Sequence, residues 1–139
     1  MVTIEDYIIV DEYAVCLNMN VVCPPTRYIR NSNLEANQKN ELGLSIEFQE
    51  ESGLFYVDIK YHGEVYLVDE LLFSIDLLYR GEVVIDFSLE QELIRNFLNV
   101  EVPQELYSSV QEIVKSTTTF SGYAAIELED YSFKEKKLK

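Results

Sequence analysis

Few side chains in this chain of 139 residues have the types and spacing that catalysis or metal binding requires. His62 is the only histidine, and no cysteine lies at a spacing from it that is typical of zinc sites. Cys16 or Cys23 would need a partnering base to act as a nucleophile, and the pattern offers none. We interpret His62 as an exposed strand residue and the two cysteines as reduced thiols.

Patterns that bind phosphate or carry out acid–base chemistry are equally weak. The five glycines are scattered and form no glycine-rich phosphate loop. Acidic pairs such as Glu50-Glu51 and Asp69-Glu70 carry little information, because 25 Asp and Glu residues in a chain of this length form pairs by chance. We therefore expect a protein that is not an enzyme and binds no metal or other cofactor. An enzyme with an unrecognised site is the alternative.

The net charge of the chain limits the classes of partner that it is expected to bind. A net charge of −14 argues against nucleic acid, which is bound through clustered Lys and Arg, and favours basic or apolar protein partners. No apolar stretch reaches the roughly 20 residues of a membrane span. Acids stand at the amino terminus where a secretory signal carries bases. We expect a cytoplasmic protein without direct membrane insertion.

Two long runs of alternating apolar and polar side chains must form the centre of the fold. A period of two over such a length is typical of a half-buried strand. His62 lies on the polar side of the first run, and only a short acidic break at residues 69–70 separates the runs, which predicts an antiparallel hairpin. The apolar positions are Phe55, Val57, Ile59, Tyr61, Val65 and Leu67 in the first run and Leu71, Phe73, Ile75, Leu77, Tyr79, Val83, Ile85 and Phe87 in the second.

Two further strands precede this hairpin. Residues 7–21 are predicted to form one strand and residues 42–49 another, joined by a loop rich in Pro and Asn that extends to Asn40. The apolar face is predicted to hold Tyr13, Val15, Leu17, Met19 and Val21 in the first of these strands and Leu44, Ile46 and Phe48 in the second.

Two helices are expected after the hairpin. Ser88 and Gln91 have the form of a capping box, and Pro103 suits the first turn of a second helix, reached through a connection at residues 99–102. Residues 117–119 are three threonines and a poor continuation of that helix, so an extended final segment is expected to follow. The order predicts one α+β domain, residues 1–133, with a four-stranded antiparallel sheet followed by two helices on one face. Residues 134–139 form a basic tail.

The carboxyl-terminal 85 residues resemble the SecB family of export chaperones. In that family, long third and fourth strands lead to a helix, a crossover loop, a proline, a longer helix starting with Leu-Phe/Tyr, and an extended Leu-x-Leu-x-x-x-x-Phe ending. Here residues 56–85 correspond to the strands, Pro103 with Leu106-Tyr107 to the second helix, and residues 126–133 to the ending.

The resemblance implies an ATP-independent chaperone that holds unfolded or partly folded polypeptides in apolar grooves, assembled as a homodimer or homotetramer. We expect self-association through the edge of strand 7–21 and the second helix. Asp76 falls where the family carries an acid on the flat sheet face that docks a translocation ATPase, and Asp58 and Ser74 extend that face. The implied client-binding residues are Phe48, Tyr56, Tyr66, Phe97, Leu98, Val100, Tyr107 and Phe120.

Simpler interpretations and a second function class remain open. Phe48 can pack in the core, Tyr56, Tyr66 and Val100 can be exposed without binding anything, and Asp76 can be an ordinary solvated residue. A dedicated interaction protein on the same fold is the second class, such as the chaperone of a toxin–antitoxin pair with an antitoxin-like partner, or a phage or plasmid accessory protein. Ser108 favours it, because the family's helix carries a second proline there.

Overall fold

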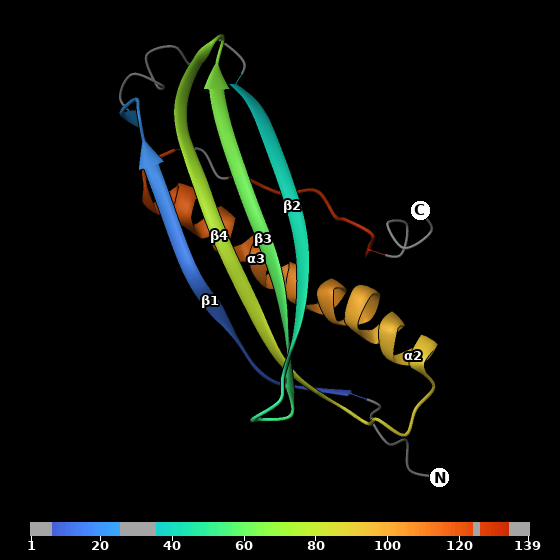
Figure 1. Cartoon of the computed structure of the whole chain (residues 1–139). Helices are drawn as coiled ribbons and strands as arrows, with labels where there is room; N and C mark the ends of the chain where they lie inside the picture. Colours follow the sequence, from blue (N-terminus) through green and yellow to red (C-terminus); the bar gives the residue numbers. More distant parts are fainter. Residues whose placement is uncertain (1–6, 26–35, 124–125, 134–139) are drawn as a thin grey trace.

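The computed structural model describes residues 7–25, 36–123 and 126–133. Four antiparallel strands form one sheet in the order β1-β4-β3-β2 (Figure 1), and their bounds are β1 Tyr7–Val21, β2 Ala36–Gln49, β3 Leu54–Leu67 and β4 Glu70–Ile85. Helical residues follow, as α2 Gln91–Asn96, the π-helix η1 Phe97–Glu101 and α3 Val102–Phe120. The predicted α+β class, a four-stranded antiparallel sheet followed by helices, is confirmed. The predicted basic tail, residues 134–139, lies outside the described residues.

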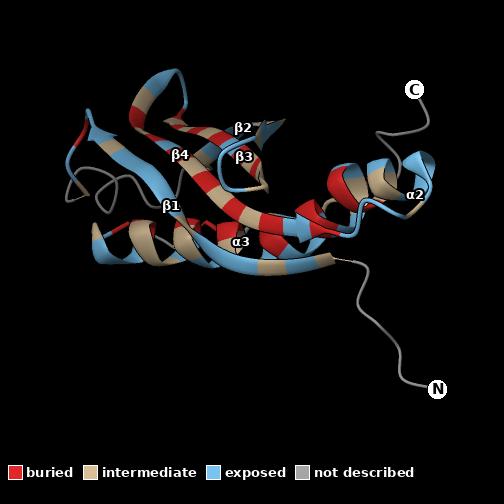
Figure 2. Ribbon diagram, turned by 60° about the horizontal axis from the view of Figure 1, so that its bottom comes forward, coloured by how far each residue is buried: buried red, intermediate tan, exposed pale blue. Residues whose placement is uncertain are grey.

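The core lies between one face of the sheet and α3, and we call that face the inner face (Figure 2). Along β3 and β4 buried residues alternate with less buried ones, as the period of two predicts. On α3, Val102, Leu106, Val110 and Val114 recur every fourth residue and are completely buried. Spacing of four places them on one stripe of the helix, which therefore packs against the alternating apolar residues of the sheet.

Strand β1 departs from the predicted alternation because it contains two bulges. Its pairing with β4 shifts by one residue between Ile9 and Asp11, and again between Ala14 and Cys16. Each shift reverses the face to which the following residues point. Leu17 pairs with Leu77 on the inner face, whereas Tyr13 pairs with Arg80 on the outer face. The prediction that Tyr13 shares a face with Leu17, Met19 and Val21 is therefore wrong.

The long alternation of β4 is also shorter than predicted. Leu72 is an extra residue between the pairs Val65–Phe73 and Tyr66–Leu71, and it is completely buried. Its carbonyl accepts hydrogen bonds from the backbone N–H groups of Val22 and Cys23, both at 2.9 Å. At the other end β4 stops at Ile85, so Phe87 lies beyond the strand and is 60% exposed. The parity prediction thus holds from Phe73 to Ile85 only.

Strand β2 begins six residues earlier than predicted, at Ala36 rather than Leu42. Residues 37–41 are all polar or charged, which is the composition of a loop, but they pair with residues 62–66 of β3. They are exposed because β2 is an edge strand, so no apolar pattern was needed there.

The helical part is more continuous than predicted. Residues 99–102 were expected to form a connection, but residues 91–120 are helical throughout, with a π-helical stretch where the connection was expected. Phe97, Leu98 and Val102 are buried, and this packing favours a continuous helix. The helix also continues through Thr118, whose hydroxyl donates to the Val114 carbonyl and accepts a hydrogen bond from the Ile126 backbone. Tertiary contacts thus override the poor helix propensity of threonine.

Candidate functional site

A groove of about 690 Å³ lies between the edge strand β2 and the segment 126–133. Tyr61 of β3 and Tyr107 of α3 contribute the buried part of its lining. The residues that line it are Ala36, Asn37, Gln38, Asn40, Leu42, Tyr61, Tyr107, Glu127, Leu128, Glu129, Asp130 and Tyr131. Apart from Tyr61 and Tyr107, these residues come from the first part of β2 and from a segment almost 90 residues later in the chain.

Three side chains on one face of α3 hold the carboxyl-terminal wall of this groove. Gln104 Nε2 donates to the Tyr131 carbonyl at 2.8 Å, the Tyr107 hydroxyl to the Glu129 carbonyl at 2.8 Å, and Gln111 Nε2 to the Leu128 carbonyl at 2.9 Å. The ring of Phe133 packs on those of Tyr107 and Tyr131, with centroids 5.9 and 4.8 Å apart. The wall is therefore attached through hydrogen bonds to its backbone carbonyls and through the ring contacts of Phe133.

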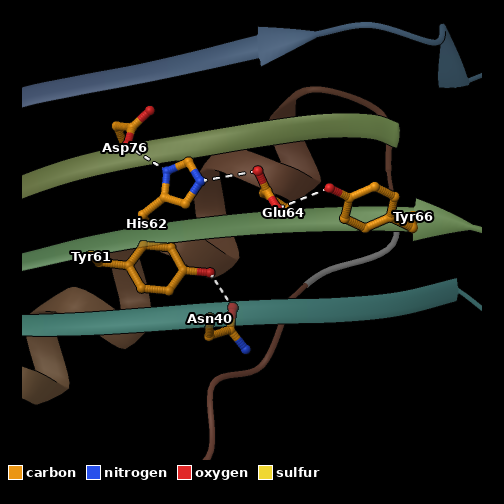
Figure 3. A network of polar contacts seen from close by, with 6 residues as sticks. All are labelled: Asn40, Tyr61, His62, Glu64, Tyr66 and Asp76. Carbon is orange, nitrogen blue, oxygen red and sulfur yellow. Dashed lines mark hydrogen bonds and ion pairs between the residues drawn. The ribbon is translucent and has the colours of Figure 1, made fainter. Parts of the chain in front are cut away.

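The hydroxyl groups of Tyr61 and Tyr107 are hydrogen-bond donors rather than nucleophiles. Tyr61 is 1% exposed and donates to Asn40 Oδ1 at 2.7 Å (Figure 3). Burial raises the pKa of Tyr61 to about 12, and burial is also the main cause that raises the pKa of Tyr107. Both phenols therefore stay protonated at neutral pH, and the groove offers hydrogen bonds instead of acid–base chemistry.

The accessible chemistry of the groove is polar and acidic. Among the described residues, its lining carries carboxylates from Glu127, Glu129 and Asp130 and carboxamides from β2, and it includes no lysine or arginine. As the edge strand, β2 also has backbone groups on its outer side that pair with no other strand in the described part of the chain. Carboxamides and an open strand edge can bind the backbone of an extended polypeptide, and carboxylates attract its basic side chains.

An aromatic cluster lies at the opposite end of β2. Phe48 packs on Phe55 of β3 with ring centroids 4.8 Å apart, and Phe87 contacts them at 5.7 and 5.8 Å. Phe48 is 41% exposed and Phe87 60% exposed. The sequence placed Phe87 on the strand face and missed its part in this cluster, because the end of β4 was not predicted.

The residues predicted to bind clients do not gather on one surface. Tyr107 lines the groove and Phe48 belongs to the aromatic cluster, but Phe97 and Leu98 are in the core. Tyr56 and Tyr66 lie on the outer sheet face, opposite α3, because they alternate with the buried residues of β3. Val100 is half-buried in η1, and Phe120 is 90% exposed at the end of α3.

Of the residues that line the groove, only Tyr107 was among the predicted client-binding residues; the start of β2, Tyr61 and the wall residues 127–131 were missed. The wall residues were the hardest to find. They show no periodicity, so the sequence predicted only an extended ending. The spacing of Gln104, Tyr107 and Gln111, three and four residues apart on one helix face, is the signal that could have indicated a polar contact there.

Of the residues predicted to dock a partner, Asp58 is already bound within the sheet. Arg80 donates from Nε and Nη2 to its two carboxylate oxygens at 2.8 and 3.0 Å, which raises the pKa of Arg80. The Arg80 guanidinium also lies 4.3 Å from the ring centroid of Tyr56. The Asp58 side chain is only 14% exposed, so it has little capacity for a further partner.

Asp76 is more accessible and contacts the single histidine. His62 Nδ1 lies 2.6 Å from Asp76 Oδ1, and its Nε2 lies 3.3 Å from Glu64 Oε2 (Figure 3). Hydrogen bonds to Asp76, and then to Glu64, raise the pKa of His62. Ser74 pairs directly with Glu64 in the sheet. His62 was expected to be an exposed strand residue; its side chain is 34% exposed and belongs to a network of polar contacts.

In the described ranges, no three His, Cys, Asp or Glu side chains gather so that they could hold a metal ion. No helix in this part of the chain has the length and apolarity to cross a membrane.

Comparisons with known proteins concern the family and the fold. The family model for SecB, described as preprotein translocase subunit SecB, matches residues 13–136. The fold is similar to that of the SecB-like chaperone of Mycobacterium tuberculosis in complex with a ChAD peptide from the HigA1 antitoxin, with 16% sequence identity, 91% of each chain covered and a TM-score of 0.76. A protein of unknown function from Streptococcus agalactiae matches at 13% identity and a TM-score of 0.34, covering 88% of this chain and 96% of that one. No curated protein matches by sequence.

Proposed function

The chain belongs to the SecB family of chaperones, and on this premise we propose that it holds unfolded or partly folded polypeptides, without ATP, along the strand β2. Its relatives in this family are chaperones and not enzymes, which agrees with the expectation from the sequence. The proposal includes a cytoplasmic location.

One observation carries this proposal: the same edge strand has the acidic groove near Ala36 and the aromatic cluster near Phe48. From Asn40 to Phe48 an extended chain covers about 26 Å at roughly 3.3 Å per residue. A client segment of about eight residues could therefore place basic side chains against Glu127, Glu129 and Asp130 while apolar side chains contact Phe48 and Phe87. Such a surface selects composition rather than one sequence, as a holding chaperone requires.

Aggregation assays test this function. Several unrelated denatured proteins are diluted from denaturant with and without the chain, in the absence of ATP, and light scattering is followed. We expect suppression of scattering for most of them at a stoichiometric amount of chaperone. Absence of suppression for every client would refute general holding.

A dedicated partner is the second candidate function. The M. tuberculosis SecB-like chaperone with a similar fold was solved with a peptide of an antitoxin, which supports a single antitoxin-like partner for this chain as well. The same assay separates the candidates, because a dedicated chaperone protects one partner and few or none of the unrelated proteins.

We further propose that the outer sheet face docks a partner protein, such as a translocation ATPase, through Asp76. Asp76 has a half-exposed side chain, whereas Asp58 is bound by Arg80 on both oxygens. Asp76 is therefore the better candidate of the two for binding a cationic side chain, with Ser74 at its side.

Self-association is also proposed, as a dimer or a tetramer. Among the strands that the structure describes, β1 is an edge strand with no neighbour on its outer side. It also exposes the large apolar side chains Ile8, Val10, Val15, Leu17 and Val21. An open apolar edge of 15 residues favours pairing with a second chain. Phe120, 90% exposed on α3, supports a further contact there.

A further inference from the structure

Both ring nitrogens of His62 lie at hydrogen-bond distance from carboxylate oxygens. Nδ1 is 2.6 Å from Asp76 Oδ1, and Nε2 is 3.3 Å from Glu64 Oε2 (Figure 3). A neutral imidazole has one N–H, so it would point a lone pair at one of the two carboxylates. Only the imidazolium donates to both. The geometry therefore corresponds to a charged His62.

The network around His62 is anchored on one side and open on the other. Tyr66 donates from its hydroxyl to Glu64 Oε1 at 2.9 Å, so Glu64 is bound at both oxygens. The Glu64 side chain is 29% exposed, whereas that of Asp76 is 53% exposed. Of the two carboxylates, Asp76 is therefore the one that a partner can reach from solvent.

The charged groups that face His62 come from three strands of the sheet. His62 pairs with Glu41 of β2 on one side and with Asp76 of β4 on the other. Asp76 in turn pairs with the uncharged Asn18 of β1. On β3 itself Glu64 and Lys60 lie two residues away on the same face, and Lys39 of β2 pairs with Glu64. Lys39 lies 5.1 Å from the Tyr66 ring centroid. Three carboxylates thus surround a ring that carries one positive charge or none.

We propose that protonation of His62 weakens the binding of a cationic partner at Asp76. The proposal rests on the docking role of Asp76 given above and adds its regulation. The imidazolium contacts Asp76 Oδ1 and repels a Lys or Arg side chain of the partner. The neutral ring carries no charge, so it does not repel that side chain. Binding of a cationic partner at Asp76 is therefore coupled to release of a proton from His62, and affinity increases as the pH rises through the titration of this ring.

The coupling has an upper limit. One proton is involved, so the association constant rises by at most about tenfold per pH unit within the titration range. Below that range His62 is fully protonated and the affinity is lowest. Above it His62 is neutral and the affinity no longer changes with pH. A partner would therefore be held more tightly in an alkaline than in an acidic medium.

Nuclear magnetic resonance of the free full-length chain tests the switch without any partner. His62 is the only histidine, so a single set of imidazole signals reports its titration. We expect a pKa above the ordinary value of about 6.5, lowered in the Asp76→Asn variant. Glu47→Gln is the matched control, because it removes one acid of β2 that lies six residues beyond Glu41 and should change the pKa less. A pKa at or below the ordinary value, or equal effects of the two variants, would overturn the proposal.

A binding measurement then separates the switch from the docking role. The probe is a tetralysine peptide, and its dissociation constant is measured between pH 5.5 and 8.5 for the wild type, Asp76→Asn and His62→Gln. We expect the affinity advantage of the wild type over Asp76→Asn to grow with pH, and a smaller pH dependence in His62→Gln. If the resonance result holds but Asp76→Asn binds like the wild type at every pH, the docking role of Asp76 is wrong and only the proton-dependent contact remains.

Discussion

Leu106 of α3 packs directly on Gly81 of β4: a Cβ added to Gly81 would lie 2.9 Å from Leu106 Cδ1. The absence of a side chain at Gly81 lets the helix approach the sheet at this point. Both residues are buried, and Leu106 is completely so. The contact joins the two layers that form the core.

The first prediction concerns this contact. Gly81→Ala should destabilise the protein by about 1–3 kcal/mol, because the helix or the Leu106 side chain must shift. Gly43→Ala is the matched control in a strand, since the nearest atom to its added Cβ would be Lys60 Cβ at 3.8 Å, an ordinary contact. Urea unfolding of both variants measures the difference. Equal stability of the two variants would show that α3 does not depend on Gly81.

The second prediction concerns Tyr107, which sequence reasoning treated as a surface residue for clients. It is 4% exposed and bonded to the Glu129 carbonyl. Tyr107→Ala should therefore cost about 3–5 kcal/mol, as for other buried aromatic side chains. Tyr107→Phe should cost about 1 kcal/mol, because it removes only the hydrogen bond. Thermal unfolding measures both, and a melting temperature unchanged in Tyr107→Ala would restore the surface interpretation.

The third prediction locates client binding. Phe120→Ser removes a ring that is 90% exposed and should cost no more than about 0.5 kcal/mol in stability. Phe87→Ser also removes two ring contacts, each of which contributes about 0.5–1.5 kcal/mol, so its effect is compared at a temperature where both variants are folded. Only Phe87 belongs to the aromatic cluster at the end of β2. We expect weaker suppression of client aggregation in Phe87→Ser and near wild-type suppression in Phe120→Ser. The opposite result would move the client site to the end of α3.

The fourth prediction is a pH dependence of stability. The pKa of His62 is raised in the folded chain by Asp76 and Glu64. The stabilisation is therefore fully present below the unfolded pKa of about 6.5 and is lost as the pH rises through the higher folded pKa. The difference in unfolding free energy between wild type and His62→Gln should shrink as the pH is raised from 5.5 to 9. A difference that stays constant over this range would contradict the charged contact.

The fifth prediction concerns assembly. Light scattering should give at least twice the chain mass of 16.2 kDa at micromolar concentration. Leu17→Lys should shift the protein towards the monomer, because Leu17 is 44% exposed on the edge strand β1. Val84→Lys is the control, since Val84 is 41% exposed but lies on β4, which has a strand on each side and is not at the edge of the sheet. A monomeric wild type would exclude self-association under these conditions.

The central hairpin and the class of the fold were predictable from the sequence. Alternation from Phe73 to Ile85 identifies β4 and its buried face, because the period of two is a local property of the backbone. The fourfold spacing of Leu106, Val110 and Val114 likewise identifies the buried stripe of α3.

The tertiary structure decided where these periodic patterns end and which residues of different elements come together. The bulges near Val10, Val15 and Leu72 reverse or shift the faces of strands, and a bulge is a property of two paired strands rather than of one sequence. Burial of Phe97 and Leu98 turned an expected connection into helix. The groove, the aromatic cluster and the contacts of His62 each join residues from different elements. Their positions depend on contacts between distant segments, which local periodicity does not encode.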